Sequence, residues 1–257
     1  MVGGRSDIRK GIGKSKGTTL REYIGSMFRQ WIQGLARRIP SQCVVCHAWP
    51  SQPVCEDCVA QFAQPVPRCR TCALPVLSGM RQCGDCLTHR SALDHCLAAV
   101  PYGYPWSRLV VEFKFRERTG WARSIATLLR SAPWVEPALD AADLLIPMPL
   151  SRQRLQVRGF NQTLLLAREL DAAKIDNHVL LRITDAAPQS SLPRKERLSN
   201  VRGAYAVDPF AVSRIKGRRL VLLDDVMTSG ASLSAAAQVL RQAGAAHITG
   251  LVFARTD

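Results

Sequence analysis

The chain has 257 residues, of which 47% are hydrophobic, so it is long enough for one large domain with a small appendage. Its net charge of +15 favours polyanionic partners such as nucleic acid, phosphate esters or an anionic membrane surface. No apolar run reaches the roughly 18 residues of a membrane span, and residues 1–6 lack the apolar core of a signal peptide. We therefore expect a cytoplasmic protein whose nine cysteines are reduced or bound to metal.

The first 40 residues carry nine Lys and Arg against two Asp and Glu. Their Gly-, Lys- and Ser-rich part, up to Thr19, predicts a disordered basic arm. Residues 20–39 then place apolar side chains at the spacing of one helical stripe, flanked by arginines. A helix packed on the main body is the simpler interpretation, and a helix contacting an anionic membrane or a partner protein is the alternative. The sequence leaves both open.

Four Cys-x-x-Cys pairs follow in a segment, residues 41–96, that is poor in aromatic residues. Both thiolates of such a pair can reach one ion, and tetrahedral zinc takes four sulfurs, so two pairs complete one site. We predict a module with two structural Zn²⁺ sites that folds only with its metal. The simplest grouping joins successive pairs, and an interleaved grouping stays open. The predicted ligands are Cys43, Cys46, Cys55, Cys58, Cys69, Cys72, Cys83 and Cys86.

Other uses of these cysteines fit less well. A disulfide framework needs an oxidising compartment, and a redox dithiol needs one pair rather than four. Cys43 to His47 matches the c-type haem attachment pattern, but the three other pairs lack the histidine. An iron–sulfur cluster is a minor alternative. Because the module has no net charge before metal binds, we expect it to stabilise or dock rather than to bind phosphate backbones, and we expect Cys96 to be a small core residue.

Beyond residue 97 short buried strands alternate with amphipathic helices. This alternation predicts an α/β domain over residues 97–257, with a parallel sheet covered on both faces. The expected strands are 96–100, 144–146, 220–223 and 248–253. The expected helices are 107–115, 121–130, 162–170 and 233–243.

The most informative stretch begins where a hydrophobic strand ends in Asp224 and Asp225, before a helix expected to open at Leu233. Backbone N–H groups at a helix start, together with the hydroxyls of the intervening loop, form an anion site. Gly230 allows the backbone to approach a phosphate closely, and paired carboxylates can accept hydrogen bonds from the vicinal hydroxyls of a ribose. The combination predicts a ribose 5-phosphate site, against the simpler interpretation of a strand-to-helix turn capped by Ser232.

Residues 220–232 resemble the phosphoribosyl pyrophosphate signature of type I phosphoribosyltransferases. Residues 146–150, 158–162 and 189–200 restrict the resemblance to one family within this class. With the cysteine module in front, the chain resembles the ComF family, which is associated with natural competence and DNA utilisation. The resemblance covers about residues 41–256 and implies a type I phosphoribosyltransferase fold preceded by a double zinc ribbon.

The resemblance also implies roles for particular residues. The acidic pair would hold the ribose hydroxyls, the loop after it the 5-phosphate, and residues 185–200 would form a mobile loop over the site, with Mg²⁺ bridging the pyrophosphate. The implied ligand-binding residues are Asp224, Asp225, Val226, Met227, Thr228, Ser229, Gly230, Ala231, Ser232, Gly159 and Asn161. The implied catalytic residues, which would stabilise the leaving pyrophosphate, are Arg158, Arg194 and Arg197.

Three functions are compatible with these features. We expect a protein that handles DNA and binds phosphoribosyl pyrophosphate or ribose 5-phosphate, with single-stranded DNA on a basic surface. An active phosphoribosyltransferase with an unknown nitrogen acceptor is the second. An adaptor is the third, docking competence or recombination proteins, or a membrane through residues 20–39. The basic surface would comprise Arg152, Arg154, Arg158, Arg218 and Arg219.

Overall fold

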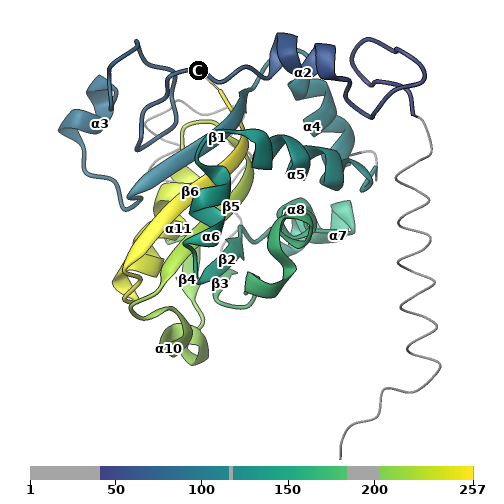
Figure 1. Ribbon diagram of the computed structural model, residues 1–257. Coiled ribbons are helices and arrows are strands. Elements are labelled where there is room, and N and C mark those ends of the chain that lie inside the picture. The colour runs from purple at the N-terminus through teal and green to yellow at the C-terminus, as the bar shows by residue number, and fades with distance from the viewer. Residues whose placement is uncertain (1–40, 116–117, 184–202, 257) are drawn as a thin grey trace, which may run out of the picture. The chain divides into compact units, whose positions relative to one another are not determined.

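Four parallel strands form the central sheet, in the order β1-β6-β5-β2 (Figure 1). The computed structural model describes residues 41–115, 118–183 and 203–256. The described residues from Gln42 onward belong to one compact unit. Within the described ranges, no helix combines the length and the apolar character needed to cross a membrane.

The sheet is built from strands far apart in the chain. Its members are β1 (His95–Pro101), β2 (Leu144–Pro147), β5 (Arg219–Met227) and β6 (His247–Arg255). A second, antiparallel sheet pairs β3 (Leu180–Arg182) with β4 (Tyr205–Val207). The helices are α2 (Glu56–Phe62), α3 (Gly84–Thr88), α4 (Trp106–Phe115), α5 (Trp121–Ser131), α6 (Val135–Asp140), α7 (Arg152–Arg158), α8 (Gln162–Asp171), α10 (Val212–Ile215) and α11 (Ala231–Gln242).

Helices cover both faces of the central sheet, with α11 on one side and α5 and α8 on the other (Figure 1). Strand β6 shows why. Its side chains alternate between two hydrophobic cores: Ile248 and Val252 enter the core with α11, and Leu251 and Phe253 enter the core with α4, α5 and α8. A strand buried on both faces reads as a continuous apolar run, so the expected parallel sheet with two covered faces is confirmed.

The cysteine module packs on these same two cores. Phe62 packs against the core of α4 and α5, and the Trp106 indole Nε1 donates to the Phe62 carbonyl oxygen at 2.9 Å. Ala73 is buried in the other core, and the backbone N–H of Cys96 donates to the carbonyl oxygen of Arg70 at 2.7 Å. The division expected after residue 96 therefore separates two parts that share hydrophobic cores.

Several element boundaries differ from expectation. The strand expected to end at residue 223 continues to Met227, because backbone pairing with β6 does not depend on the acidic side chains and extends to the pair Met227 and Arg255. The following helix opens at Ala231 rather than Leu233. Helices α6 and α7 and the sheet of β3 and β4 were not expected. The expected loop 185–200, with Arg194 and Arg197, and the expected arm and helix of residues 1–40 lie outside the described residues.

Candidate functional site

A cavity of about 160 Å³ lies where β2 and β5 end. Ligands of open parallel sheets bind beyond the carboxyl ends of the strands, so the position alone marks a candidate site. Residues 224–233 form one side of the cavity. The cavity is also lined by four cationic side chains, Lys114, Arg154, Arg158 and Arg182.

The two carboxylates of this cavity differ in their surroundings. Asp225 is 4% exposed, and its Oδ1 atom lies 3.0 Å from Nζ of Lys114 and accepts from the Val226 N–H at 2.7 Å. Its Oδ2 atom is buried and has no hydrogen-bond partner among the described residues. Because a buried acceptor without a partner is costly, this oxygen is suited to receive a ligand hydroxyl or a cation.

Asp224 is half-buried beside this pair, and its Oδ1 accepts from the Asp225 N–H at 2.9 Å. Burial, and then the charge of Asp225, raise the pKa of Asp224 to about 7, although Lys114 opposes the shift. Near neutral pH the acidic pair therefore holds a proton that the binding of a cation would displace.

The raised pKa predicts a pH-dependent effect of Asp224→Asn on the ligand-free protein. The folded state retains the Asp224 proton up to about pH 7, whereas the unfolded chain loses it near pH 4. Between these values the folded state binds more protons, so stability falls as pH rises. We expect Asp224→Asn to raise the Tm at pH 8, by about 2–4 °C for each kcal/mol of repulsion relieved, and to change it little at pH 5. Thermal unfolding at both pH values measures this, and equal shifts at pH 5 and pH 8 would contradict it.

The loop between β5 and α11 has the backbone of an anion site. Gly230 has a φ of +78°, a backbone conformation that disfavours any other residue. A Cβ atom there would lie 2.4 Å from Cε of Met227, the flexible end of a side chain that would have to shift. The Ser229 hydroxyl oxygen lies 3.4 Å from the Ala231 N–H, which it caps. Because α11 starts at Ala231, the N–H groups of its first turn, which have no partner within the helix, and its positive dipole end adjoin the cavity.

A buried arginine holds this loop in place. Arg255, 3% exposed, donates through Nη1 to the carbonyl oxygens of Met227 at 3.3 Å and Thr228 at 2.5 Å. Its Nε donates to the carbonyl oxygen of Cys72 at 2.9 Å. The Met227 sulfur also contacts Sγ of Cys96 at 3.6 Å. The Arg255 side chain and the contact between Met227 and Cys96 thus fasten the loop to the second half of the cysteine module.

Arg158, the last residue of α7, faces the acidic pair. Its Nη1 donates to Oε1 of Gln162 at 2.6 Å, and its guanidinium carbon lies 4.9 Å from the centroid of the Phe115 ring. Burial lowers the pKa of Arg158, while the charges of Asp225 and Asp224 raise it. An arginine remains protonated under such shifts, so Arg158 offers a fixed positive charge to an anionic ligand.

Gly159 and Asn161 have structural tasks beside the cavity and do not line it. Gly159 ends α7 with a φ of +75°. Asn161 caps α8, with Oδ1 accepting from the Thr163 N–H at 3.0 Å and Nδ2 donating to the Met148 carbonyl oxygen at 3.1 Å. Both shape the turn between α7 and α8, and through it the position of Arg158.

Three lining residues were missed by sequence reasoning. Lys114 reaches the cavity from the last turn of α4. The only feature of the sequence that could have indicated this role is a cationic residue placed between two phenylalanines. Arg182 and Tyr205 come from β3 and β4, and Nη1 of Arg182 donates to the Tyr205 hydroxyl at 3.3 Å. Both residues line the cavity.

The five arginines expected to form one basic surface are divided in space. Arg154 and Arg158 line the cavity at the carboxyl end of β5. Arg218 and Arg219 lie at the opposite end of that strand, where Nη1 of Arg218 is 3.3 Å from Oδ1 of Asp143. A DNA strand bound along α7 would therefore not meet this second pair at the same place.

The eight module cysteines form two clusters, each with all Sγ atoms within 4.8 Å of one another. The structure groups successive pairs, and so decides against the interleaved arrangement.

Burial opposes ionisation of Cys43, but backbone N–H groups, among them that of Cys55 at 3.4 Å, lower its pKa to about 6. Burial and the neighbouring sulfurs raise the pKa of Cys58. Four thiolates so close together need a cation to ionise jointly, and a set of four sulfurs is able to bind zinc. The clusters are Cys43, Cys46, Cys55 and Cys58, and Cys69, Cys72, Cys83 and Cys86.

An acidic pair at the end of one parallel strand, followed by an anion loop and a helix, places the chain among proteins of the type I phosphoribosyltransferase fold, here with a double zinc ribbon in front. Competence protein F of Haemophilus influenzae is 31% identical over 206 residues, covering 76% of this chain and 87% of that protein. The chain belongs to the ComF family.

Two further relatives are similar to this chain over most of their length. DNA utilization protein YhgH of Salmonella typhimurium is 28% identical over 227 residues, covering 85% of this chain and 98% of that protein. Competence protein ComFC of Bacillus subtilis is 29% identical over 217 residues, covering 80% and 86%. No protein-family model matches the chain.

Similarity to solved structures is slight. The allosteric regulatory enzyme of purine biosynthesis is 17% identical with a TM-score of 0.35, covering 55% of this chain and 29% of that one. The glutamine phosphoribosylpyrophosphate amidotransferase of B. subtilis is 15% identical with a TM-score of 0.34, covering 55% and 30%. The chain spans less than a third of either structure, and the assignment of the fold rests on the sheet, the loop and the family instead.

Proposed function

We propose that the protein binds 5-phosphoribosyl pyrophosphate together with Mg²⁺ in the cavity at the carboxyl end of β5. The observation that carries the proposal is the buried Oδ2 atom of Asp225, which has no partner in the described part of the chain. Asp225 lines a cavity that is also lined by four cationic side chains and by the loop before α11. A phosphoribosyl ligand offers vicinal hydroxyls between two phosphate groups. Those hydroxyls can donate hydrogen bonds to the acidic pair. One phosphate group can be bound by the loop before α11 and the other by the arginines of the cavity.

Each part of the ligand has a partner in the cavity. The 5-phosphate would accept hydrogen bonds from the N–H groups and hydroxyls of residues 228–232 at the start of α11. The ribose hydroxyls would donate to Asp224 and Asp225. The pyrophosphate would face Arg154 and Arg158. When bound, Mg²⁺ would neutralise pyrophosphate charge, and the carboxylate oxygens of the acidic pair are ligands of the kind it prefers.

The same arrangement suits transfer of the phosphoribosyl group. Arg158 is held beside the acidic pair, so its charge would stabilise pyrophosphate as it leaves. Arg194 and Arg197 are proposed from the sequence as further partners of the leaving group. Release of pyrophosphate in the presence of candidate nitrogen acceptors would separate an enzyme from a ligand sensor.

Calorimetric titration tests the binding proposal. We expect the zinc-loaded full chain to bind phosphoribosyl pyrophosphate with Mg²⁺, and the double variant Asp224→Asn, Asp225→Asn to lose at least about 100-fold in affinity, because two charge-assisted hydrogen-bond sites are removed. Asp171→Asn is the matched control, since Asp171 caps a turn remote from the cavity and Asn can cap it equally. Equal affinity in wild type and the double variant would overturn the proposal.

A comparison with ribose 5-phosphate distinguishes the residues that bind pyrophosphate from those that bind the 5-phosphate. Arg158→Ala should weaken phosphoribosyl pyrophosphate by about tenfold or more and leave ribose 5-phosphate nearly unchanged, because only the first ligand carries a pyrophosphate. A uniform loss for both ligands would place Arg158 elsewhere in the site.

We also propose that the protein acts in DNA utilisation, as the names of its relatives state for them. The charge of +15 and the arginines of α7 support contact with single-stranded DNA. Competence or recombination proteins, and a membrane contacted through residues 20–39, are proposed as further partners. A DNA affinity that falls steeply with salt would support the first partner, and membrane recruitment lost on deleting residues 1–40 would support an adaptor role.

A further inference from the structure

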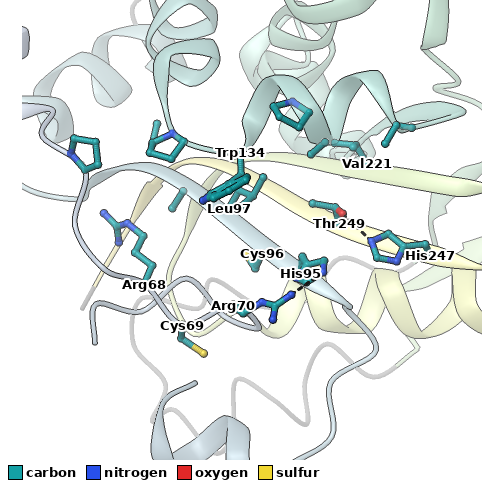
Figure 2. Close-up of a pocket in the computed structure, with 18 of the residues that line it drawn as sticks. Arg68, Cys69, Arg70, His95, Cys96, Leu97, Trp134, Val221, His247 and Thr249 are labelled. Carbon is teal, nitrogen blue, oxygen red and sulfur yellow. Dashed lines mark hydrogen bonds between the residues drawn. The ribbon is translucent and has the colours of Figure 1, made fainter. Parts of the chain in front are cut away.

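A second and larger cavity, of about 800 Å³, lies beside the amino-terminal ends of β1, β5 and β6 (Figure 2). Leu97, Ala99 and Val221 of the sheet line it. The segments 65–70, from the cysteine module, and 133–142, around α6, line it as well. Small-molecule sites have this size and this mainly apolar lining with a few convergent polar groups.

The second cavity is distinct from the phosphoribosyl site. His95, Arg219 and His247 are the first residues of their strands, whereas the acidic pair lies near the end of β5. Asp225 lies six positions after Arg219 along an extended strand, which corresponds to about 20 Å. Ligands of the two sites would therefore not touch.

Trp134 gives the cavity an aromatic wall. Trp134 is 74% exposed and lines the cavity, and its backbone has a φ of +69°, the left-handed region that bulky residues rarely adopt. Such a conformation costs on the order of 1 kcal/mol or more and persists where surrounding structure enforces it. An exposed indole held in this way is suited to stack on a flat ligand.

The polar end of the cavity is positively charged. Nη2 of Arg70 lies 3.5 Å from Nε2 of His95, and the rings of His95 and His247 are 5.5 Å apart (Figure 2). Arg219 pairs with His247 across the sheet and lines the same cavity. No acidic residue is among the described residues that line it, and no carboxylate of the described chain forms a salt bridge with the guanidinium of Arg70 or Arg219. Asp143 lies near Arg219 but accepts from its backbone N–H, at 2.8 Å.

The surrounding groups leave this charge available. Asp94, beside the two histidines, already accepts from Arg241 and from the Ile248 N–H at 2.7 Å, and its Oδ2 lies 3.6 Å from Nδ1 of His247. Nε of Arg219 donates to the Ala141 carbonyl oxygen at 3.2 Å, which occupies one of its donors and leaves its charge uncompensated. Burial lowers the pKa of both histidines, and Arg70 adds to the effect on His95. Neutral imidazoles can donate to or accept from a ligand, while the two arginines supply the charge.

We propose that this cavity is a second ligand site, which takes a small aromatic anion. The flat body of the ligand would lie against Trp134 and Leu97, and its carboxylate or phosphate would be bound by Arg70 and Arg219. The proposal is independent of the phosphoribosyl site.

The test titrates 1-naphthoate and adenosine monophosphate into the zinc-loaded full chain, with the neutral isostere 1-naphthalenemethanol as a comparison. We expect at least one anion to bind, and Arg219→Ala to weaken it by about tenfold. Arg218→Ala is the matched control and should change affinity less than about twofold, because that neighbouring arginine pairs with Asp143 and does not line the cavity. The better of the two anions distinguishes a carboxylate from a phosphate head group.

Trp134→Gly is a second variant whose folding is not at risk, since glycine relieves the left-handed backbone at this position. It should weaken the same ligand by several-fold, while Trp49→Gly, at another exposed tryptophan outside the cavity, should not. The proposal is overturned if neither anion binds, if the neutral isostere binds equally well, if Arg219→Ala and Arg218→Ala behave alike, or if phosphoribosyl pyrophosphate displaces the bound anion.

Discussion

Removal of metal from the two cysteine clusters is expected to lower the Tm by more than about 10 °C. A structural zinc site contributes about 10–16 kcal/mol in small zinc-binding domains, which is as large as the whole stability of a typical domain. Here the clusters are continuous with the cores of the sheet. Cys43 and Cys69 are both fully buried, and Ala73 and Phe62 pack against the two cores. Loss of metal should therefore destabilise the sheet as well as the module.

Metal analysis and thermal unfolding in the presence of a chelator measure this effect. We expect two zinc ions per chain, released together with the loss of folded structure. Cys46→Ser and Cys72→Ser should each leave one ion, because Cys46 belongs to the first cluster and Cys72 to the second. A chain that keeps its Tm after complete removal of the metal would show that the clusters do not support the fold.

Arg255→Ala is expected to cost about 3 kcal/mol or more in stability and about tenfold or more in phosphoribosyl pyrophosphate affinity. The guanidinium donates to the carbonyl oxygens of Cys72, Met227 and Thr228. The Met227 carbonyl would keep the Thr256 N–H at 3.0 Å, but those of Cys72 and Thr228 would lose this donor, at about 1–3 kcal/mol for each acceptor left unpaired. Two of these carbonyls belong to the anion loop or to the residue before it. Release of the loop should weaken binding even though Arg255 does not line the cavity.

A matched variant separates this positioning role from general destabilisation. Arg241 also binds several backbone carbonyls, those of Ala92, Ala245 and Ala246, but at the other end of the sheet. Arg241→Ala should lower the Tm and leave ligand affinity unchanged. Arg255→Lys keeps the charge but has fewer directed donors, so it should recover stability only in part. If Arg241→Ala and Arg255→Ala reduced affinity equally, the loop would not depend on Arg255 in particular.

The covered parallel sheet and the anion loop were predictable because both are local patterns. A strand buried on two faces appears as an unbroken apolar run, and a loop that binds phosphate needs its small and hydroxyl residues in consecutive positions. The double zinc ribbon was predictable for the same reason, since each Cys-x-x-Cys pair is complete within four residues. Successive grouping of the pairs was the simplest option, and the structure adopts it.

The rest of the site depends on contacts between distant segments. Lys114 meets Asp225 across 111 positions of the chain, and Arg182 meets Tyr205 only because β3 and β4 pair. The role of Arg255 is likewise set by the register of β5 and β6, which brings it beside Met227. No local pattern encodes such juxtapositions, so side chains that look like ordinary surface cations become part of the site only after folding.

The strand order has a consequence for the sequence of events during folding. Pairing His95 with Thr249 closes a loop of about 150 residues, whereas each cysteine cluster closes a segment of fewer than 20. Contacts between distant residues form slowly, because a large loss of chain entropy precedes any gain from them. We therefore expect zinc to be captured while the central strands are still unpaired, so that the loaded ribbon acts as a template against which β1 and then β6 assemble.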